Sequence, residues 1–220
     1  MIKADKIIYS KRKTISLSVD NEGRVIVRAP LKCPDRRINE ALGDSESWIK
    51  KQLKKYEESR LIADRYSVKN GGKILLLGDE FEICFADIKA ADVKGKTIFL
   101  PENKNPQEQL KTLFKKIAVG YFTERTQYFS SLTGLVPSSV KVTSAKTRWG
   151  SCNAEKRISY SLSLVMCPLN VIDYVIVHEL CHIKHLNHSA LFWSEVEKVI
   201  PDYRDRRKWL RDNQYITDLI

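Results

Sequence analysis

Residues 178–182 read His178-Glu179-Leu180-Cys181-His182, an HExxH motif that decides how the C-terminal half of the chain folds. On a helix, residues four apart lie on the same face, so the two imidazoles can reach one metal ion. Glu179 is rotated by about a quarter turn, which suits a water on that ion better than the ion itself. The motif therefore predicts a helix that carries two metal ligands and the general base of a hydrolase.

The motif needs a third ligand, because a catalytic zinc site has three protein ligands and one open position. His185 follows His178 by seven residues, and this separation, about 10 Å along a helix, is too long for both to bind one ion together with His182. His188 is better placed if the chain reverses after the helix, and Asn187 tolerates the left-handed conformation that such a turn requires. We therefore expect one zinc ion per chain, bound by His178, His182 and His188.

Two alternatives to this site stay open at the level of the sequence. A carboxylate of the following segment, Glu195 or Glu197, could replace His188 as the third ligand. The zinc could also be structural, in a binding module without enzymatic activity. Structural zinc sites usually have four protein ligands, whereas this cluster offers three imidazoles and the adjacent Glu179, which favours a catalytic site.

Other residues are candidates for supporting the chemistry. The negative charge that develops on a substrate oxygen needs a further hydrogen-bond donor, and Arg148 and Tyr203 are candidates for this role or for other substrate contacts. Asn187 and Ser189 could orient the ligands by hydrogen bonds. We expect Trp193 to pack against the site and to hold it in position.

The segments around the motif predict one strand and two helices. Residues 157–166 alternate apolar and polar side chains, as a strand does, and this strand could pair with an extended substrate. A mostly apolar helix is expected over residues 171–185, with Asn170 as its N-cap. Ser189 is expected to cap the helix that follows.

The chain upstream of the motif divides by its patterns. Residues 107–132 repeat apolar side chains with helical spacing. The first hundred residues are rich in alternating, strand-like patterns, which a helical stretch after Pro34 interrupts. We therefore expect two domains in an α+β protein: a β-rich N-terminal region with a helical insertion over residues 1–103, and the catalytic core over residues 104–220.

A set of motifs extends from the HExxH residues over nearly the whole chain. It comprises Arg148-Trp149-Gly150-Ser151-Cys152, Pro168, Val171-Ile172-Asp173-Tyr174-Val175, Asn187-His188-Ser189, Phe192-Trp193 and, more weakly, Lys13-Thr14-Ile15-Ser16 and Val27-Arg28-Ala29-Pro30. With these motifs the chain resembles the YgjP-like metallopeptidases (DUF45), which are similar to the SprT and WLM zinc peptidases. The resemblance implies a zincin-like catalytic core, with helices packed on a small mixed sheet, and three histidine ligands. For this site we expect hydrolysis of peptide bonds by a zinc-activated water with Glu179 as general base. The resemblance does not supply a substrate.

Charge narrows the possible partners. The 220 residues contain 38 Lys and Arg against 27 Asp and Glu, which gives a formal charge of +11. This charge permits a nucleic-acid-associated zinc protease, with contacts at residues 50–55 and 204–211. We favour the simpler interpretation, that these segments are solvated helix faces and that the partner is a protein or peptide substrate.

Cysteine usage and hydropathy predict the compartment. The five cysteines are scattered and form no C-x-x-C pair, which argues against a disulfide framework and favours a reducing cytoplasm. No stretch approaches the roughly 18 consecutive apolar residues of a membrane span, and the N-terminal residues do not have the pattern of a signal peptide. The sequence therefore predicts a cytoplasmic protein without a membrane partner.

Overall fold

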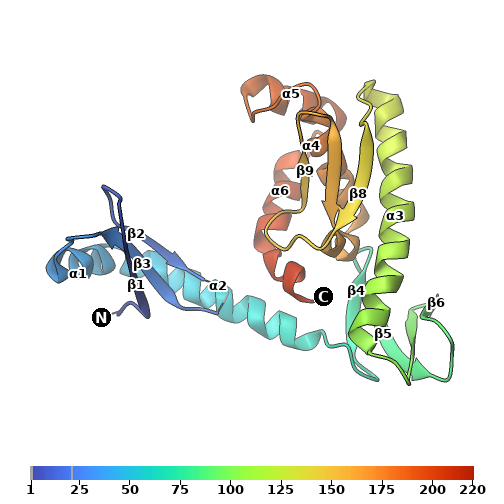
Figure 1. Cartoon of the computed structure of the whole chain (residues 1–220), viewed down its shortest axis with the longest axis horizontal. Helices are drawn as coiled ribbons and strands as arrows, with labels where there is room; N and C mark the ends of the chain where they lie inside the picture. The colour runs from blue at the N-terminus through green and yellow to red at the C-terminus, as the bar shows by residue number, and fades with distance from the viewer. Residues whose placement is uncertain (1, 21) are drawn as a thin grey trace. The chain divides into compact units, whose positions relative to one another are not determined.

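A computed structural model describes residues 2–20 and 22–220 of the chain (Figure 1). Within these residues the fold is α+β, as predicted, with six α-helices, two short 3-10 helices and three small sheets. The chain divides into two compact units, Met1–Ile62 and Ala63–Ile220. No helix of the described ranges combines the length and apolar character needed to cross a bilayer.

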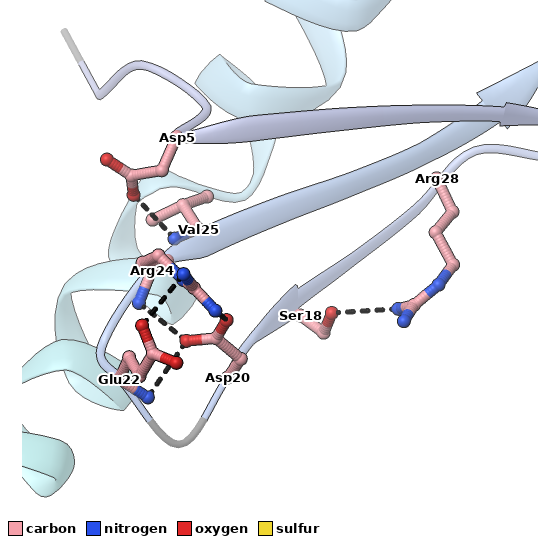
Figure 2. Close-up of polar contacts among 7 residues, drawn as sticks. All are labelled: Asp5, Ser18, Asp20, Glu22, Arg24, Val25 and Arg28. Carbon is pink, nitrogen blue, oxygen red and sulfur yellow. Dashed lines mark hydrogen bonds and ion pairs between the residues drawn. The ribbon is translucent and has the colours of Figure 1, made fainter.

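The first unit is a three-stranded sheet covered by helices. Its strands are β1 (Lys6–Ser10), β2 (Ser16–Val19) and β3 (Val25–Pro30), in the order β1-β3-β2. Residues from β3, α1 (Asp35–Asp44) and the first part of α2 (Glu46–Arg65) form its core, namely Val25, Val27, Ala29, Ile38, Leu42 and Ile49. At the start of β3, the Asp20 carboxylate accepts hydrogen bonds from the backbone N–H of Arg24 and from its guanidinium (Figure 2).

The second unit opens with a four-stranded sheet in the order β4-β5-β7-β6. Its strands are β4 (Lys73–Leu76), β5 (Asp79–Ala86), β6 (Asp92–Lys94) and β7 (Thr97–Pro101). Ile83 and Leu100 of this sheet share one buried cluster with Phe114 and with residues of the metal-motif helix. The sheet therefore groups with the C-terminal residues, and the division falls after residue 62, whereas the sequence predicts it after residue 103.

A long helix, α3 (Pro106–Thr133), follows and matches the predicted helical spacing. Asn105 caps its start by accepting a hydrogen bond from the backbone N–H of Glu108. Gly134 ends it at φ 72°, a left-handed conformation that glycine adopts without strain. The next sheet has the order β8-β10-β9 and consists of β8 (Ser139–Thr143), β9 (Gly150–Cys152) and β10 (Arg157–Ser161).

The strand predicted over residues 157–166 is shorter than the alternation suggests. It ends at Ser161, and Leu162–Met166 form a buried 3-10 helix. The Ser161 hydroxyl accepts a hydrogen bond from the backbone N–H of Ser163 and donates one to the carbonyl of Ala145, which supports the change of direction. β10 also lies between β8 and β9, so both of its edges are already paired. The expectation that β10 pairs with substrate is therefore wrong.

The metal-motif helix, α4, spans Leu169–Cys181 rather than residues 171–185. It starts from Pro168, whose carbonyl accepts the first intrahelical hydrogen bonds, so Asn170 is not its N-cap. Beyond Cys181 the chain forms a tighter, 3-10-like turn. The N–H groups of Ile183 and Lys184 donate hydrogen bonds to the carbonyls of the residues three positions earlier in the chain. The chain ends with α5 (Ala190–Val199), α6 (Tyr203–Asp212) and a 3-10 helix (Gln214–Asp218).

Candidate metal centre

Three histidines meet at the end of α4. His178 lies in its last turn, His182 directly follows its last residue, and His188 returns from the loop before α5. One ring nitrogen of each lies within 4.8 Å of the other two. The Nε2 atoms of His178 and His188 are 3.1 Å apart. The early end of α4 and the tight turn after it therefore bring the three imidazoles to one point.

The backbone fixes the orientation of His182. Its Nδ1 lies 2.9 Å from the carbonyl oxygen of His185. A carbonyl only accepts hydrogen bonds, so Nδ1 carries the proton and Nε2 keeps a free lone pair for a metal. The ring of His185 does not belong to the histidine group. The helix has already ended before His185, so the chain turn, and not helix geometry alone, keeps this ring apart.

Burial favours the neutral form of the His178 and His188 imidazoles, which is the form that binds metal. Desolvation first, and then the neighbouring His182 and His188, lower the pKa of His178 to about 3. The pKa of His188 is also lowered, mainly by burial and then by His182 and Arg207. Neutral imidazoles carry the lone pairs that a cation needs, so these two rings are ready to bind a metal at neutral pH.

Glu179 is buried beside the histidines, with 5% of its surface exposed. Burial raises the pKa of its carboxyl to about 8, and the charge of Arg148 opposes this shift. Gly150 of β9 lies directly against the carboxyl, because a Cβ at residue 150 would be 2.6 Å from Glu179 Oε1. Sequence patterns alone assigned no role to Gly150. Its position in the Arg148–Cys152 motif is the feature that could have indicated one.

Aromatic rings from α5 and α6 hold the ligands in place. Phe192 stacks on His182 with ring centroids 4.5 Å apart. Trp193 stacks on His188 at 5.5 Å, and Tyr203 stacks on the Trp193 ring at 5.1 Å. Trp193 thus packs against the site, and Tyr203 reaches it through Trp193. Sequence reasoning did not assign Phe192 to the site.

The remaining candidates for supporting the site are Ser189, Asn187 and Arg148. Ser189 caps α5 by accepting a hydrogen bond from the backbone N–H of Phe192. Asn187 is exposed, and no hydrogen bond joins its side chain to a ligand within the described residues. The expected left-handed conformation at Asn187 is wrong, because the non-glycine residues described with positive φ are Leu77 and Lys156. Arg148 is exposed, and its charge acts on Glu179.

The alternative carboxylate ligands are engaged elsewhere. Glu195 forms ion pairs with Lys184 at 3.1 Å and with Lys198 at 3.2 Å. Glu197 pairs with Arg204 at 2.9 Å. Neither glutamate joins the group of potential ligands, in which His188 is the third member.

Comparison with known proteins gives a family match. The model of the YgjP-like metallopeptidase domain matches residues 13–213. Among solved structures, the metallopeptidase zymogen of Pyrococcus abyssi abylysin is 21% identical, with a TM-score of 0.39, and the match covers 42% of this chain and 95% of that one. No curated protein matches the chain.

Proposed function

The chain belongs to the YgjP-like metallopeptidase family, and from this premise we propose that it is a zinc-dependent peptidase with His178, His182 and His188 as its metal ligands. The observation that carries the proposal is the convergence of three imidazole nitrogens within 4.8 Å beside the buried Glu179. Three neutral nitrogen donors without a carboxylate suit zinc better than magnesium or calcium. One such group supports one zinc ion per chain.

The proposed mechanism uses Glu179 as the general base. When bound, zinc supplies Lewis acidity, which polarises a peptide carbonyl and makes water more acidic. Glu179 takes a proton from the attacking water as the new C–O bond forms. It then gives this proton to the amide nitrogen as the C–N bond breaks, and an acid and an amine leave. Glu179 is buried, and it would be ionised for the first step if a cation were held by the three histidines beside it.

Other residues would support this reaction from the edges of the site. Arg148 is our first candidate for stabilising the oxyanion or contacting substrate, because its charge already acts on Glu179. Tyr203 is a weaker candidate, since its ring is stacked on Trp193. We assign Ser189 and Trp193 to holding His188 in place.

The cysteines bear on the compartment, and the ion pairs of the basic segments bear on the nucleic-acid alternative. All five cysteines are free thiols in the structure, which supports a reducing compartment such as the cytoplasm. Several cations of the two basic segments already have acidic partners, among them Lys50 with Glu46 and Lys54 with Glu58. Paired cations release fewer counterions from nucleic acid, so we keep a protein or peptide as the substrate.

The decisive test combines metal analysis with Glu179→Gln. We expect about one zinc per purified chain, retained in this variant, and cleavage of an unfolded protein such as casein by the wild type but not by the variant. Glu195→Gln is the matched control, because Glu195 is paired with lysines away from the histidines. It should keep both zinc and activity. A Glu179→Gln protein that cleaves as fast as the wild type would refute the mechanism.

A second measurement addresses the ligands themselves. His188→Ala removes one of the three imidazoles, and its zinc content should fall well below that of the wild type, since three-ligand sites tolerate the loss of a ligand poorly. His185→Ala is the control, because it keeps the backbone carbonyl that contacts His182 and changes a ring outside the group of potential ligands. Equal zinc loss in the two variants would contradict the assignment of His188.

A further inference from the structure

Arginines of the second unit divide into two groups. Eight arginines lie between residues 63 and 220. Six of them form ion pairs: Arg65 with Glu80, Arg125 with Asp173, Arg157 with Glu155, Arg204 with Glu197, Arg206 with Asp202 and Arg211 with Asp212. Within the described part of the chain, Arg148 and Arg207 have no acidic partner. These two are also the arginines whose charges act on Glu179 and on the metal-binding histidines.

Arg207 lies beside the metal centre through one aromatic ring. Its guanidinium carbon is 4.9 Å from the centroid of the Trp193 ring. The Trp193 ring also stacks on the His188 ring, and its centroid is 5.7 Å from the centroid of the His178 ring. The positive charge of Arg207 lowers the pKa of both histidines, in addition to the larger effect of burial. A guanidinium without a counter-ion is therefore placed next to the metal ligands.

The surroundings hold Arg207 ready for a ligand. A guanidinium over an indole ring keeps the N–H groups at its edges available, and the ring restricts its movement. The neighbouring Arg206 fixes α6, because it pairs with Asp202 and donates a hydrogen bond to the carbonyl of Asn170 at the start of α4. A positioned, exposed cation loses little entropy when it binds an anion.

We propose that Arg207 binds a carboxylate of the peptide substrate, so that the enzyme prefers peptides with an acidic group close to the scissile bond. The planar guanidinium matches a carboxylate through two parallel hydrogen bonds. A peptide offers this chemistry from an Asp or Glu side chain or from its free C-terminus. The inference rests on the proposed peptidase function, whose test is the loss of cleavage in Glu179→Gln.

The first test compares matched peptides. One pair differs only by Glu against Gln beside the scissile bond, with the C-terminus amidated, and a second pair of neutral peptides differs only by a free or amidated C-terminus. We expect the wild type to prefer the acidic member of one pair by about tenfold in kcat/KM, as one charged hydrogen bond would give. Arg207→Gln should remove this preference, so that the two members of each pair are cleaved with equal kcat/KM.

Arg204→Gln is the matched control. Arg204 is on the same helix and also lies over an aromatic ring, that of Tyr203, but it is paired with Glu197. This variant should discriminate between the peptides as the wild type does. Arg207→Glu should invert the preference and favour a lysine-containing peptide. A wild type that cleaves both members of each pair equally, or an Arg207→Gln variant that keeps the preference, overturns the proposal.

Binding separates this inference from the proposed activity. Zinc-loaded Glu179→Gln is titrated with the same peptides, and isothermal titration calorimetry measures their binding. Tighter binding of the acidic peptide that Arg207→Gln abolishes supports the proposal even if the wild type cleaves nothing, an outcome that would count only against the peptidase function. Equal binding of acidic and neutral peptides overturns the proposal whether or not they are cleaved.

Discussion

The two compact units differ in the polar residues that they bury. In Met1–Ile62, charged side chains pair at the surface, as Asp20 and Arg24 do, and the buried residues that the structure describes there are apolar. In Ala63–Ile220, six polar residues are buried, and Glu179 is the ionisable one among those described. Burying an ionisable group costs free energy, and such groups gather at functional sites. We therefore expect the buried Glu179 to lower the stability of the second unit at the site where we propose catalysis.

Glycines offer the sharpest way to test this difference. A Cβ at Gly150 would be 2.6 Å from Glu179 Oε1, whereas a Cβ at Gly43 in α1 would meet nothing within 4 Å. Gly150→Ala should therefore displace the carboxyl and lower kcat by about 100-fold or more, because small misplacements of a catalytic group are costly. Gly43→Ala should leave activity unchanged and stabilise α1 by about 0.5 kcal/mol. Peptidase assays and denaturant unfolding of the full chain measure both.

A double variant shows whether Gly150 acts through Glu179. If it does, Gly150→Ala adds no further loss of activity in a Glu179→Gln background, since the group it positions is already gone. Zinc content should stay near one per chain throughout. An additive loss, or a loss of zinc, would mean that Gly150 supports the site by another route.

Glu179 and Asp20 should also give opposite dependences of stability on pH. Burial raises the pKa of Glu179 to about 8, so its folded form keeps a proton that the unfolded chain has released above the ordinary value of 4.5. The metal-free protein should therefore lose stability as pH rises from 6.5 to 8, by about 2 kcal/mol over this window. His178, whose pKa is lowered to about 3, is neutral in both states over most of this range and contributes little.

Substitutions distinguish the contributions of Glu179 and Asp20 to the pH dependence of stability. Glu179→Gln does not titrate, so the metal-free variant should show a flatter profile and a higher stability at pH 8 than the wild type. The pKa of Asp20 is lowered, chiefly by hydrogen bonding from the Arg24 backbone, so its contribution is complete above the ordinary value of 3.8 and is lost only as pH falls. Asp20→Asn should keep the same slope as the wild type between pH 6.5 and 8. Equal slopes in all three proteins would contradict the account of Glu179.

Local patterns predicted the features that depend on neighbours in sequence. The spacing of His178 and His182 and the spacing of α3 were sufficient, because helix geometry is set within a few residues. The placement of Gly150 against Glu179 and of Arg207 over Trp193 depends on contacts between distant elements. No periodicity within one element carries that information, so these two contacts were visible only in the structure.

The predictions that differed failed for a related reason. Residues 158–164 alternate like a strand, but Leu162–Met166 are all buried, including Ser163, so alternation does not mark an exposed face there. The strand ends where its partner β8 ends, at the pair Ser161 and Thr143. Similarly, the strand-like patterns around Ile83 and Leu100 predict that both belong to a separate β-rich region. In the structure both share one core with residues of α3.

One ion pair from each unit extends the comparison to charged contacts. Arg125 binds Asp173 through two hydrogen bonds of 2.8 and 2.7 Å that join α3 to α4, and both side chains are at least three-quarters buried. Arg125→Met leaves the Asp173 carboxylate without a partner and should lower the free energy of unfolding by about 2 kcal/mol. Arg24→Met removes an exposed pair and should have a much smaller effect, because water solvates the carboxylates that remain. Urea unfolding of both variants at low and high salt measures this, and the cost of Arg125→Met should change less with salt. Equal costs would mean that burial does not separate the polar contacts of the two units.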